Sequence, residues 1–305
     1  EQTMLRKWTS GMLAMVAAVS RLAATHAAAG ENPRGTIGKI MSTKKLRLNI
    51  NAAGEPYLFR DINGNPCGLS MDIQRMLAKE FDADLVITDV DWSGLIPSML
   101  SKKSDFLAIH MSQTIARAKV VAFTEPFYVL EDVAFIRASD QEKYGDWNNL
   151  NAAGAKIAVI GGTHAEATAK TKFYKAELVV FNTDVDCFQA LVSGRVDAHV
   201  NGEGLMSMVK SSYGGQVVIA DKPQSGLMAD KMAFATRPDD LFTNRFLDFW
   251  LRANIENGKI PAVIDYWFNN DAYQDDFKKN AAVGKMSRDR DLLVNLLGIQ
   301  DYDPD

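Results

Sequence analysis

The feature that most constrains the fold is an alternation of short apolar runs with helix-period segments, which begins near Lys44 and occurs twice along the chain. In the first series, residues 46–51 predict a strand, apolar side chains recur at helical spacing from about Ser70, and residues 85–88 predict a second strand. The second series begins with residues 156–160 and repeats this plan. A βαβ unit needs a sheet with helices packed on its faces. The sequence therefore predicts an α/β fold of two lobes, each a mixed β-sheet flanked by helices.

Two crossings of the chain between these lobes are predicted, near residues 134–138 and near residues 230–236. Two strands that pass between the lobes would form a hinge. Further strands are predicted at residues 105–110, 177–181, 197–200 and 216–219. The predicted division is lobe 1 over residues 37–135 and 233–270, lobe 2 over residues 136–232, and a C-terminal tail over residues 271–305.

Further segments have distinct patterns. Residues 114–121 predict a short helix that is capped by Ser112 or Thr114. The polar, Asn-rich residues 139–151 predict a surface excursion, and the apolar residues 292–299 predict a docking segment in the tail. A long helix is predicted to pack on lobe 1 through a face that carries Phe242, Phe246, Phe249, Trp250 and Ala253.

The N-terminal residues 1–29 include the pattern of a secretory signal peptide. Arg6 and Lys7 precede thirteen uncharged residues, and the small-residue run 27–29 follows. A bilayer-spanning helix needs about 20 apolar residues, so the uncharged run is too short to be one. An amphipathic transit peptide is the alternative, since residues 4–29 lack acidic groups, but the clustered apolar centre favours export. We expect a cleavable signal peptide and a periplasmic protein.

Charge and cysteine content exclude other classes of protein. The formal charge of −4 provides no basic field for nucleic acid, whose binding depends on Lys and Arg, so we expect no nucleic-acid partner. Cys67 and Cys187 lie on opposite halves of the chain, and we expect both to be buried thiols. Four histidines without metal-ligand spacing predict no metal site, and the sequence has no phosphate loop or nucleophile elbow. We expect no cofactor.

The segment Met111–Tyr128 carries the most specific motif. In it, Thr114 and Arg117, three residues apart, precede a run of aromatic, acidic, proline and aromatic residues. This segment resembles its counterpart in polar amino-acid-binding proteins. Residues 61–72, 91–97 and 194–198 are also similar to signatures of that family and occur in the family's order. Over about residues 40–270, the chain therefore resembles the periplasmic solute-binding proteins of family 3, which have the type II periplasmic-binding-protein fold.

The resemblance implies a function and partners. It implies that a small carboxylate-bearing ligand, an amino acid or an organic acid, binds in a cleft between the lobes. It also implies delivery to an ABC transporter permease in the inner membrane by a monomeric binding protein that closes around its hinge. Two rival functions stay open. One is a periplasmic lyase similar to cyclohexadienyl dehydratases on the same fold. The other is a sensory or partner-docking module that uses the tail from Asp271.

Arg117 and Thr163 are the principal candidate ligand contacts. A guanidinium one turn into a helix that follows a buried strand can direct its fork at a carboxylate, although a surface ion pair with Glu125 or Asp91 is the alternative. The turn Gly161-Gly162-Thr163-His164 lies between a predicted strand and helix, where backbone N–H groups attract anions. The resemblance implies that this turn holds the ligand's carboxylate from the opposite lobe to the arginine. A tight connection without ligand is the alternative.

Aromatic and polar residues extend the candidate site. The family tends to carry an aromatic residue at the position of Trp92 that packs on the ligand's side chain, and a core tryptophan is the alternative. Tyr57 and Asn51 follow the first strand, and ligand sites in such sheets gather at the carboxyl ends of strands. Ser112 and His110 belong to the motif segment and its preceding strand, and they complete this part of the candidate site.

Gly202 is the main departure from the family pattern, because related proteins commonly place there an Asp that binds the ligand's ammonium. Either Glu203 or Asp230 takes over this role, or the ligand has no free α-amino group. His110 and His164 flank the expected site and can donate to a second acceptor, although a lone histidine is more often structural. Glu203, or Asp230 with Lys231, is also the candidate acid for the lyase, because an enclosed carboxyl group can have a raised pKa.

Overall fold

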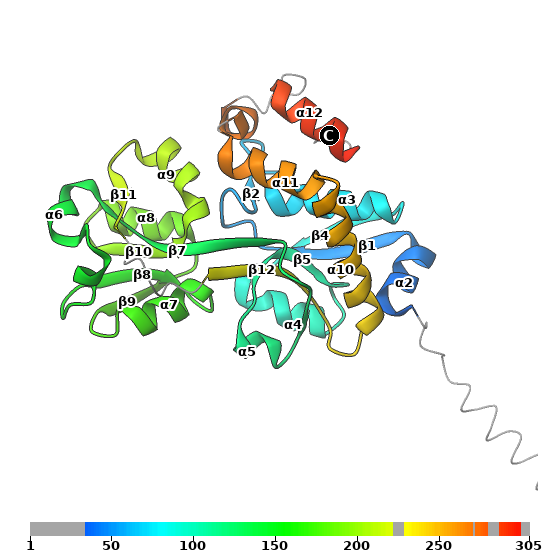
Figure 1. Cartoon of the computed structure of the whole chain (residues 1–305), viewed down its shortest axis with the longest axis horizontal. Helices are drawn as coiled ribbons and strands as arrows, with labels where there is room; N and C mark the ends of the chain where they lie inside the picture. Colours follow the sequence, from blue (N-terminus) through cyan, green and yellow to red (C-terminus); the bar gives the residue numbers. More distant parts are fainter. Residues whose placement is uncertain (1–33, 222–228, 271, 280–286, 300–305) are drawn as a thin grey trace, which may run out of the picture.

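The computed structural model describes residues 34–221, 229–270, 272–279 and 287–299, and it has two α/β lobes joined side by side (Figure 1). The predicted two-lobed α/β fold is therefore confirmed. The predicted signal peptide, residues 1–29, lies outside the described residues. Among the residues described, no helix combines the length and the apolar character needed to span a membrane.

Lobe 1 is built on a sheet of parallel and antiparallel strands. Strand β1 (Lys45–Ile50) runs parallel to β4 (Asp84–Asp89), and α3 (Leu69–Glu80) connects them as the predicted βαβ unit. A bridge between Leu48 and Phe106 links β1 to the start of β5 (Leu107–Ser112). The other elements of this part are α2 (Gly35–Thr43), β2 (Phe59–Arg60), β3 (Pro66–Cys67), α4 (Leu95–Leu100), α5 (Ile115–Ala118) and β6 (Ala122–Phe123).

Lobe 2 repeats this plan around a second mixed sheet. Strand β8 (Lys156–Ile160) runs parallel to β9 (Glu177–Phe181) and to β10 (Ala198–Gly202). The helices α7 (His164–Lys172) and α8 (Asp184–Val192) connect these strands, and threonine hydroxyls at Thr163 and Thr183 cap their N-termini. The remaining elements are α6 (Gln141–Tyr144), α9 (Met206–Tyr213) and β11 (Val217–Ile219).

Two long strands, β7 (Tyr128–Arg137) and β12 (Ala229–Thr236), pass between the lobes (Figure 1). Residues of β7 from Tyr128 to Glu131 pair with β12, whereas those from Asp132 to Ile136 pair with β10 of lobe 2. The first crossing is therefore earlier in the chain than the predicted residues 134–138. The lobe boundaries predicted from the sequence, at 135/136 and 232/233, both fall to the C-terminal side of the paired hinge segments.

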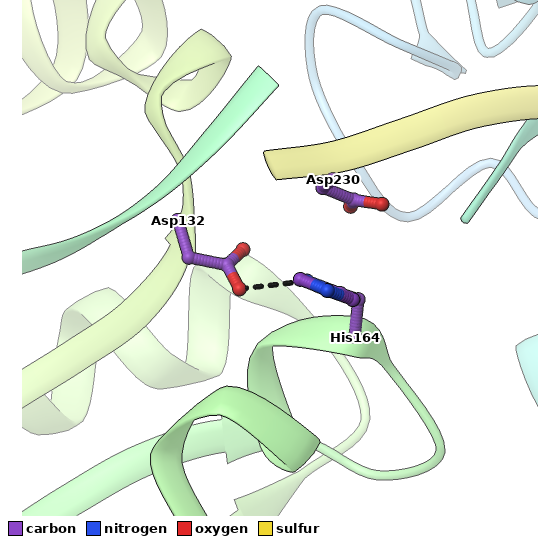
Figure 2. A group of neighbouring side chains, drawn as sticks. All are labelled: Asp132, His164 and Asp230. Carbon is purple, nitrogen blue, oxygen red and sulfur yellow. Dashed lines mark hydrogen bonds and ion pairs between the residues drawn. The ribbon is translucent and has the colours of Figure 1, made fainter. Parts of the chain in front are cut away.

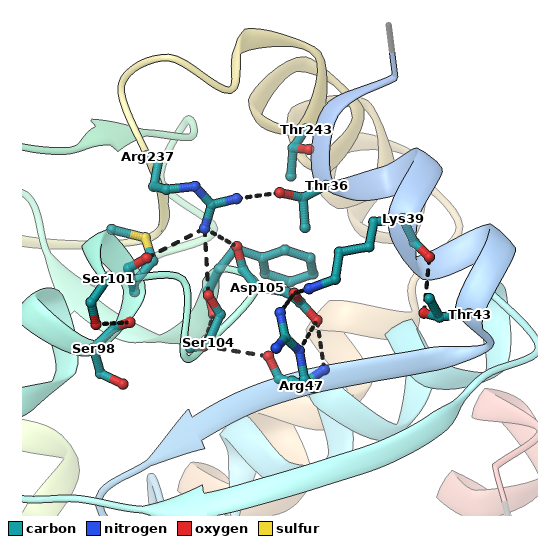
Figure 3. Close-up of polar contacts among 12 residues, drawn as sticks. Thr36, Lys39, Thr43, Arg47, Ser98, Ser101, Ser104, Asp105, Arg237 and Thr243 are labelled. Carbon is teal, nitrogen blue, oxygen red and sulfur yellow. Dashed lines mark hydrogen bonds and ion pairs between the residues drawn. The ribbon is translucent and has the colours of Figure 1, made fainter. Parts of the chain in front are cut away.

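Polar contacts tie the N-terminal helix α2 to lobe 1 (Figure 3). Arg237 bonds through its guanidinium to Thr36 at the start of α2 and to the backbone oxygen of Asp105, at 3.0 Å. The Asp105 carboxylate accepts hydrogen bonds from Lys39 at 3.2 Å and from Arg47 at 2.6 Å. These charged groups lie at the end of lobe 1 that is distant from the hinge, and their role is structural.

Two sequence-based predictions for helical segments are wrong. Residues 139–151 are not a simple surface excursion, because Tyr144, Trp147 and Leu150 are buried in the core of lobe 2. The predicted apolar face of α10 (Leu241–Glu256) is rotated by about one residue: Phe249 is 68% exposed and Phe242 is 47% exposed. The buried residues of α10 are Thr243, Asn244, Leu247, Trp250, Leu251 and Asn254.

The reason for the rotation of α10 is that polar side chains at its N-terminal end bond to lobe 1. Asn244 donates to the backbone oxygen of Ala122 at 3.4 Å, and Thr243 accepts from the backbone N–H of Ile37 at 3.3 Å. These bonds turn Thr243 and Asn244 inward. The helix still packs on lobe 1, as predicted, through α2 and β12.

The C-terminal residues pack against lobe 1. After α11 (Lys259–Ile264) come two wide helical turns, at Asp265–Asn269 and Gln274–Lys279, and then α12 (Arg288–Leu297). Leu293, Leu297 and Ile299 are buried in the core of lobe 1, so the predicted docking segment does pack on the protein. Cys67 and Cys187 are both buried and free, as predicted.

Candidate functional site

A cleft between the two lobes contains most of the predicted site residues. It encloses about 650 Å³ of space, part of which is open to solvent. Because strands from both lobes end here, side chains at strand ends and in the following loops converge on it. The predicted residues that line the cleft are Asn51, Tyr57, Trp92, His110, Ser112, Thr163, His164 and Asp230.

Aromatic side chains line the cleft on the side of lobe 1. The ring of His110 stacks on Tyr57 with centroids 4.4 Å apart, and Trp92 lies 5.5 Å from His110 on its other side. Burial, together with the nearby Arg117 charge, lowers the pKa of His110 to about 3, so this ring is neutral at physiological pH. Its Nδ1 atom lies 3.1 Å from the hydroxyl of Ser70. Neutral, flat surfaces of this kind suit the apolar part of a small ligand.

Arg117 lies at the rim of the cleft and bridges the lobes. Its Nη1 donates to the backbone oxygen of Ser112 at 2.8 Å, and its Nη2 donates to the backbone oxygen of Gly162, in lobe 2, at 2.7 Å. Its guanidinium also lies 5.6 Å from the centre of the Trp92 ring. The helix that carries Arg117 is capped by Thr114, which decides between the two predicted caps. In this form the arginine bonds to carbonyl oxygens and holds the cleft closed.

The turn before α7 is largely occupied by its own capping interactions. The Thr163 hydroxyl donates to the Ile160 oxygen at 2.7 Å and accepts from the Glu166 N–H at 3.1 Å. The Gly162 N–H donates to the Glu166 carboxylate at 2.7 Å. The next residues, His164 and Ala165 at the start of the helix, line the cleft. Backbone N–H groups in the first turn of a helix have no partners within that helix.

Asp132, His164 and Asp230 form a buried cluster beside the cleft (Figure 2). His164 Nδ1 lies 2.8 Å from Asp132 Oδ2, which also accepts a hydrogen bond from Thr168 at 2.6 Å. The hydrogen bond with Asp132 raises the pKa of His164, against the opposing effect of burial. The raised pKa favours the protonated form of His164, which is the form that pairs with the Asp132 carboxylate.

Asp230 is the buried acid of this cluster that faces the cleft. Only 6% of it is exposed, and Ser112 donates a hydrogen bond of 2.9 Å to its Oδ2. Its other oxygen, Oδ1, is buried with no hydrogen-bond partner among the residues described. Burial raises the pKa of Asp230 to about 6, and the neighbouring Asp132 charge adds to this. Buried acceptors are nearly always paired, so this unpaired oxygen makes Asp230 a candidate contact for a ligand donor.

The space that a side chain at Gly202 would need is already filled. A Cβ atom there would lie 3.1 Å from the Tyr57 hydroxyl and 3.6 Å from Leu130 Cδ1. The Tyr57 hydroxyl is itself buried with no hydrogen-bond partner in the described part of the chain. Glu203, the other candidate substitute for the family's Asp, is exposed and is not among the cleft-lining residues. The structure therefore favours Asp230 over Glu203.

A second histidine–aspartate pair lies on the lobe 2 side of the cleft. His199 Nε2 lies 3.0 Å from Asp184 Oδ1, and its Nδ1 lies 3.1 Å from the backbone oxygen of Ala158. Both partners only accept hydrogen bonds, so both ring nitrogens carry protons and the ring is cationic. Burial opposes this charge, but Cys187 and Asp184 raise the pKa of His199 to about 10. Asn201 donates to the same Asp184 oxygen at 2.7 Å.

These lobe 2 residues were missed from the sequence, although a signal existed. Asn182 and Asp184 directly follow β9, and Asn201 lies near the end of β10. Asn51 was selected because ligand sites gather at the carboxyl ends of strands. The same rule applies to Asn182, Asp184 and Asn201. Asp132 carried no such signal, because it lies within a hinge strand.

The cluster in Figure 2 also has the composition of a metal site. Asp132, His164 and Asp230 each offer one ligand atom, and these atoms lie within 4.8 Å of one another. Carboxylate and imidazole ligands suit several divalent cations. However, Asp132 and His164 are already paired with each other, and the first turn of α7 directs a partial positive charge here. An organic ammonium on Asp230 fits these contacts without breaking the pair.

Comparisons with known proteins agree with this architecture. The sequence model described as "Bacterial extracellular solute-binding proteins, family 3" matches residues 46–270. The cyclohexadienyl dehydratase of Pseudomonas aeruginosa is 21% identical over 253 residues, which covers 83% of this chain and 93% of that protein. The ABC transporter arginine-binding protein 1 of Escherichia coli is 22% identical over 241 residues, which covers 74% of this chain and 92% of that protein.

Solved structures of solute-binding proteins have a similar fold. The ancestral amino acid-binding protein AncCDT-1, described as a precursor of cyclohexadienyl dehydratase, superimposes with a TM-score of 0.71. It is 28% identical, and the match covers 77% of this chain and 100% of that one. Both binding proteins and a dehydratase are thus among the proteins that resemble this chain.

Proposed function

Because the chain belongs to the bacterial extracellular solute-binding proteins of family 3, we propose that it captures a small amino-acid-type solute in the cleft between its lobes. The solute's carboxylate faces Arg117 and the first turn of α7, and its ammonium faces Asp230. The apolar part of the solute packs on Trp92 and His110.

The observation that carries this proposal is the balance of charge around the cleft. Asp132 and Asp184 each already have a histidine partner, His164 and His199 respectively. Asp230, which lines the cleft, and Arg117, which lies beside the cleft-lining residues Trp92 and Ser112, then remain as opposite charges. A guanidinium at one end and a carboxylate at the other complement an α-amino acid, which carries both charges. The unpaired Oδ1 of Asp230 and the unpaired hydroxyl of Tyr57, within the described residues, are further positions for ligand hydrogen bonds.

The proposal extends to transport. Closure of the lobes around the solute changes the shape of the protein and breaks no covalent bond, which is the behaviour of a capture protein. We assign the protein to the periplasm, as a monomer that delivers the solute to an ABC transporter permease in the inner membrane. The relatives that are amino-acid-binding proteins of ABC transporters support this assignment.

A thermal-shift screen of the twenty L-amino acids and their deaminated carboxylic acids tests the proposal. A ligand present at 100 times its Kd stabilises the folded state by about 2.7 kcal/mol. At least one amino acid should raise the Tm of the full chain, and at the same concentration its shift should fall by about half or more in Asp230→Asn. If only compounds without an amino group stabilise the protein, Asp230 does not bind an ammonium.

The second candidate function is a lyase, and the observation that favours it is the pKa of Asp230. An enclosed carboxyl group with a pKa of about 6 can donate a proton near neutral pH, which is the property of a general acid. A dehydratase with 21% identity adds support. In this reading Asp230, not Glu203, is the acid, since Glu203 is exposed and outside the cleft.

Incubation with a cyclohexadienyl carboxylic acid distinguishes the two functions. A lyase would form an aromatic product, which absorbs in the ultraviolet, and the rate would fall at least a hundredfold in Asp230→Asn. A binding protein would leave the compound unchanged in both variants. Glu203→Gln is the matched control, because it removes an exposed carboxylate from the same region without changing the cleft.

A further inference from the structure

The C-terminal residues contribute one side chain that touches both lobes. Tyr273 is fully buried, at 0% exposure, and its hydroxyl lies 3.1 Å from Glu55 Oε1 and 2.8 Å from Ser207 Oγ. Glu55 belongs to the loop of lobe 1 that brings Gly54 and Tyr57 to the cleft. Ser207 lies on α9, in lobe 2. A single residue beyond the family's matched range therefore connects the cleft loop with the opposite lobe.

The chemistry of these contacts sets the direction of each hydrogen bond. A carboxylate only accepts, so the single proton of the Tyr273 hydroxyl goes to Glu55, and the Ser207 hydroxyl donates to the Tyr273 oxygen. Gln274 donates to the same Glu55 oxygen at 3.0 Å. All four residues are at least nine-tenths buried. Inside the protein, breaking such a network leaves polar groups without partners, which is unfavourable.

The segment 272–279 is itself fixed to lobe 1. Tyr273 packs with its ring 5.3 Å from Trp267 and 6.2 Å from Phe59. The backbone oxygen of Phe277 accepts a hydrogen bond of 3.0 Å from the Ile62 N–H. The contacts with Trp267, Phe59, Ile62 and Glu55 all lie within lobe 1, whereas the contact with Ser207 crosses to lobe 2. The geometry of the contact between Tyr273 and Ser207 therefore depends on how the two lobes are oriented relative to each other.

We propose that the C-terminal segment 272–279 is a latch in which Tyr273 positions the cleft loop through Glu55 and holds lobe 2 through Ser207, so that it stabilises the closed form. A contact made in one arrangement of the lobes shifts the population toward that arrangement. The functional meaning of the latch rests on the proposed capture of a solute by closure. The contacts of Tyr273 themselves do not depend on which solute binds.

The test uses Tyr273→Phe and Ser207→Ala in the full chain without ligand. Tyr273→Phe keeps the buried ring and removes only the hydroxyl, and Ser207→Ala removes the partner in lobe 2. The matched control is Tyr266→Phe, because the Tyr266 hydroxyl donates to Asp276 at 2.6 Å and makes no hydrogen bond with lobe 2 among the described residues. Hydrogen exchange reports the loop through the mutual backbone bonds of Gly54 and Leu58, at 2.8 Å and 3.0 Å. Small-angle X-ray scattering reports the separation of the lobes.

We expect exchange at Gly54 and Leu58 to be about two- to tenfold faster in Tyr273→Phe than in the wild type, the range for one lost hydrogen bond. Both Tyr273→Phe and Ser207→Ala should increase the radius of gyration, and the double variant should add little to either. Tyr266→Phe should change neither measurement. The latch would be overturned if Tyr273→Phe had the same exchange rates and radius of gyration as the wild type. It would also be overturned if Tyr266→Phe changed both quantities as much as Tyr273→Phe does. Failure of amino acids to bind would instead contradict the proposed function and leave these results unchanged.

Discussion

At the scale of single residues, Tyr57 explains the departure at Gly202. A Cβ at residue 202 would come within 3.1 Å of the Tyr57 hydroxyl. Asp230 on β12 places a carboxylate in the cleft from the hinge, and we propose that it serves in place of the family's Asp.

Asp230→Asn should weaken amino-acid binding by about ten- to a hundredfold, the range for a lost charge-assisted hydrogen bond. In the wild type, affinity should be constant above pH 7 and fall about tenfold per pH unit below the pKa of Asp230, about 6, because a proton competes with the ammonium. Asp230→Asn should remove this pH dependence. Calorimetric titrations between pH 5 and 8 measure both effects.

The effect of pH on folding stability does not mask its effect on ligand affinity. The pKa of Asp230 is raised in the folded state above its ordinary value near 3.8, so the folded state binds this proton more tightly than the unfolded state does. As far as Asp230 is concerned, stability therefore rises as the pH falls from about 6 toward 4. His164, Asp132 and Arg117 also act on Asp230, and the same titration of His164→Gln shows whether their charges move the midpoint.

Gly202→Ala tests the role of Tyr57. The added Cβ must displace the Tyr57 hydroxyl by a few tenths of an ångström, so ligand affinity should fall about three- to tenfold. In a Tyr57→Phe background the clash is relieved, and the further loss caused by Gly202→Ala should be small. Calorimetry on the four proteins of this cycle measures the coupling. Fully additive losses would show that Tyr57 and Gly202 act independently.

At the scale of elements, the sequence predicts the strands well and the helix faces less well. The strands at 156–160 and 177–181 have the predicted bounds, because each is a continuous apolar run that follows one charged residue. The face of α10 is wrong by one residue, since a pattern of apolar residues cannot show that Thr243 and Asn244 bond inward. Burial of Trp147 within a polar segment depends on tertiary packing that no local pattern contains.

The candidate site, like the helix faces, could be predicted from the sequence only in part. Eight of the ten predicted site residues line the cleft, because the family motif and the strand-end rule both act through position along the chain. What could not be predicted is the state of the side chains. The pairing of His199 with Asp184, and the engagement of Arg117 by two carbonyl oxygens, arise between distant segments.

The element α12 is held by a buried ion pair. Arg290, at 0% exposure, donates to both oxygens of Asp72 on α3, at 2.5 Å and 3.0 Å, and Trp267 donates to the same carboxylate at 2.8 Å. Burial alone would raise the pKa of Asp72, but the Arg290 charge and hydrogen bonds lower it overall. The pair therefore fixes the C-terminal helix beside the segment that carries Tyr273.

Arg290→Met should lower the free energy of unfolding by at most about 3–5 kcal/mol, because the buried Asp72 charge loses its fully buried partner and keeps only Arg75 and Trp267. The double variant Asp72→Asn/Arg290→Met should recover part of this loss. The pKa of Asp72 is depressed by folding, so its contribution to stability is present above the ordinary Asp pKa and is lost as the pH falls through the lowered value. Urea unfolding at pH 7 and pH 3 measures these differences. An unchanged midpoint in Arg290→Met would show that the ion pair contributes nothing.

At the scale of the whole molecule, the contacts that join the lobes in the described part of the chain include three beside the cleft. They are the bond from Arg117 to Gly162, the packing of Tyr57 against Gly202, and the bond between Tyr273 and Ser207. The first two lie at the ligand site, whereas the third comes from the C-terminal segment. Closure therefore depends on ligand-binding residues and on a part of the chain outside the region that matches the family.

Arg117→Lys should impair closure more than it impairs charge complementarity. A lysine keeps the positive charge, but a single ammonium cannot reproduce the planar fork that reaches the Ser112 and Gly162 oxygens together. We expect amino-acid affinity to fall about tenfold and the radius of gyration of the complex to increase. Arg117→Ala should lose still more affinity. Equal affinity in Arg117→Lys and the wild type would show that the fork geometry is unimportant.

The central claim is that the cleft complements both charges of an α-amino acid. Calorimetric titration of the full chain tests it with three compounds: the amino acid that gives the largest thermal shift, its deaminated acid and its decarboxylated amine. The account predicts that the amino acid binds and that each truncated compound binds at least tenfold more weakly, since each leaves Asp230 or Arg117 without a partner. A deaminated acid that binds as tightly as the amino acid would contradict it.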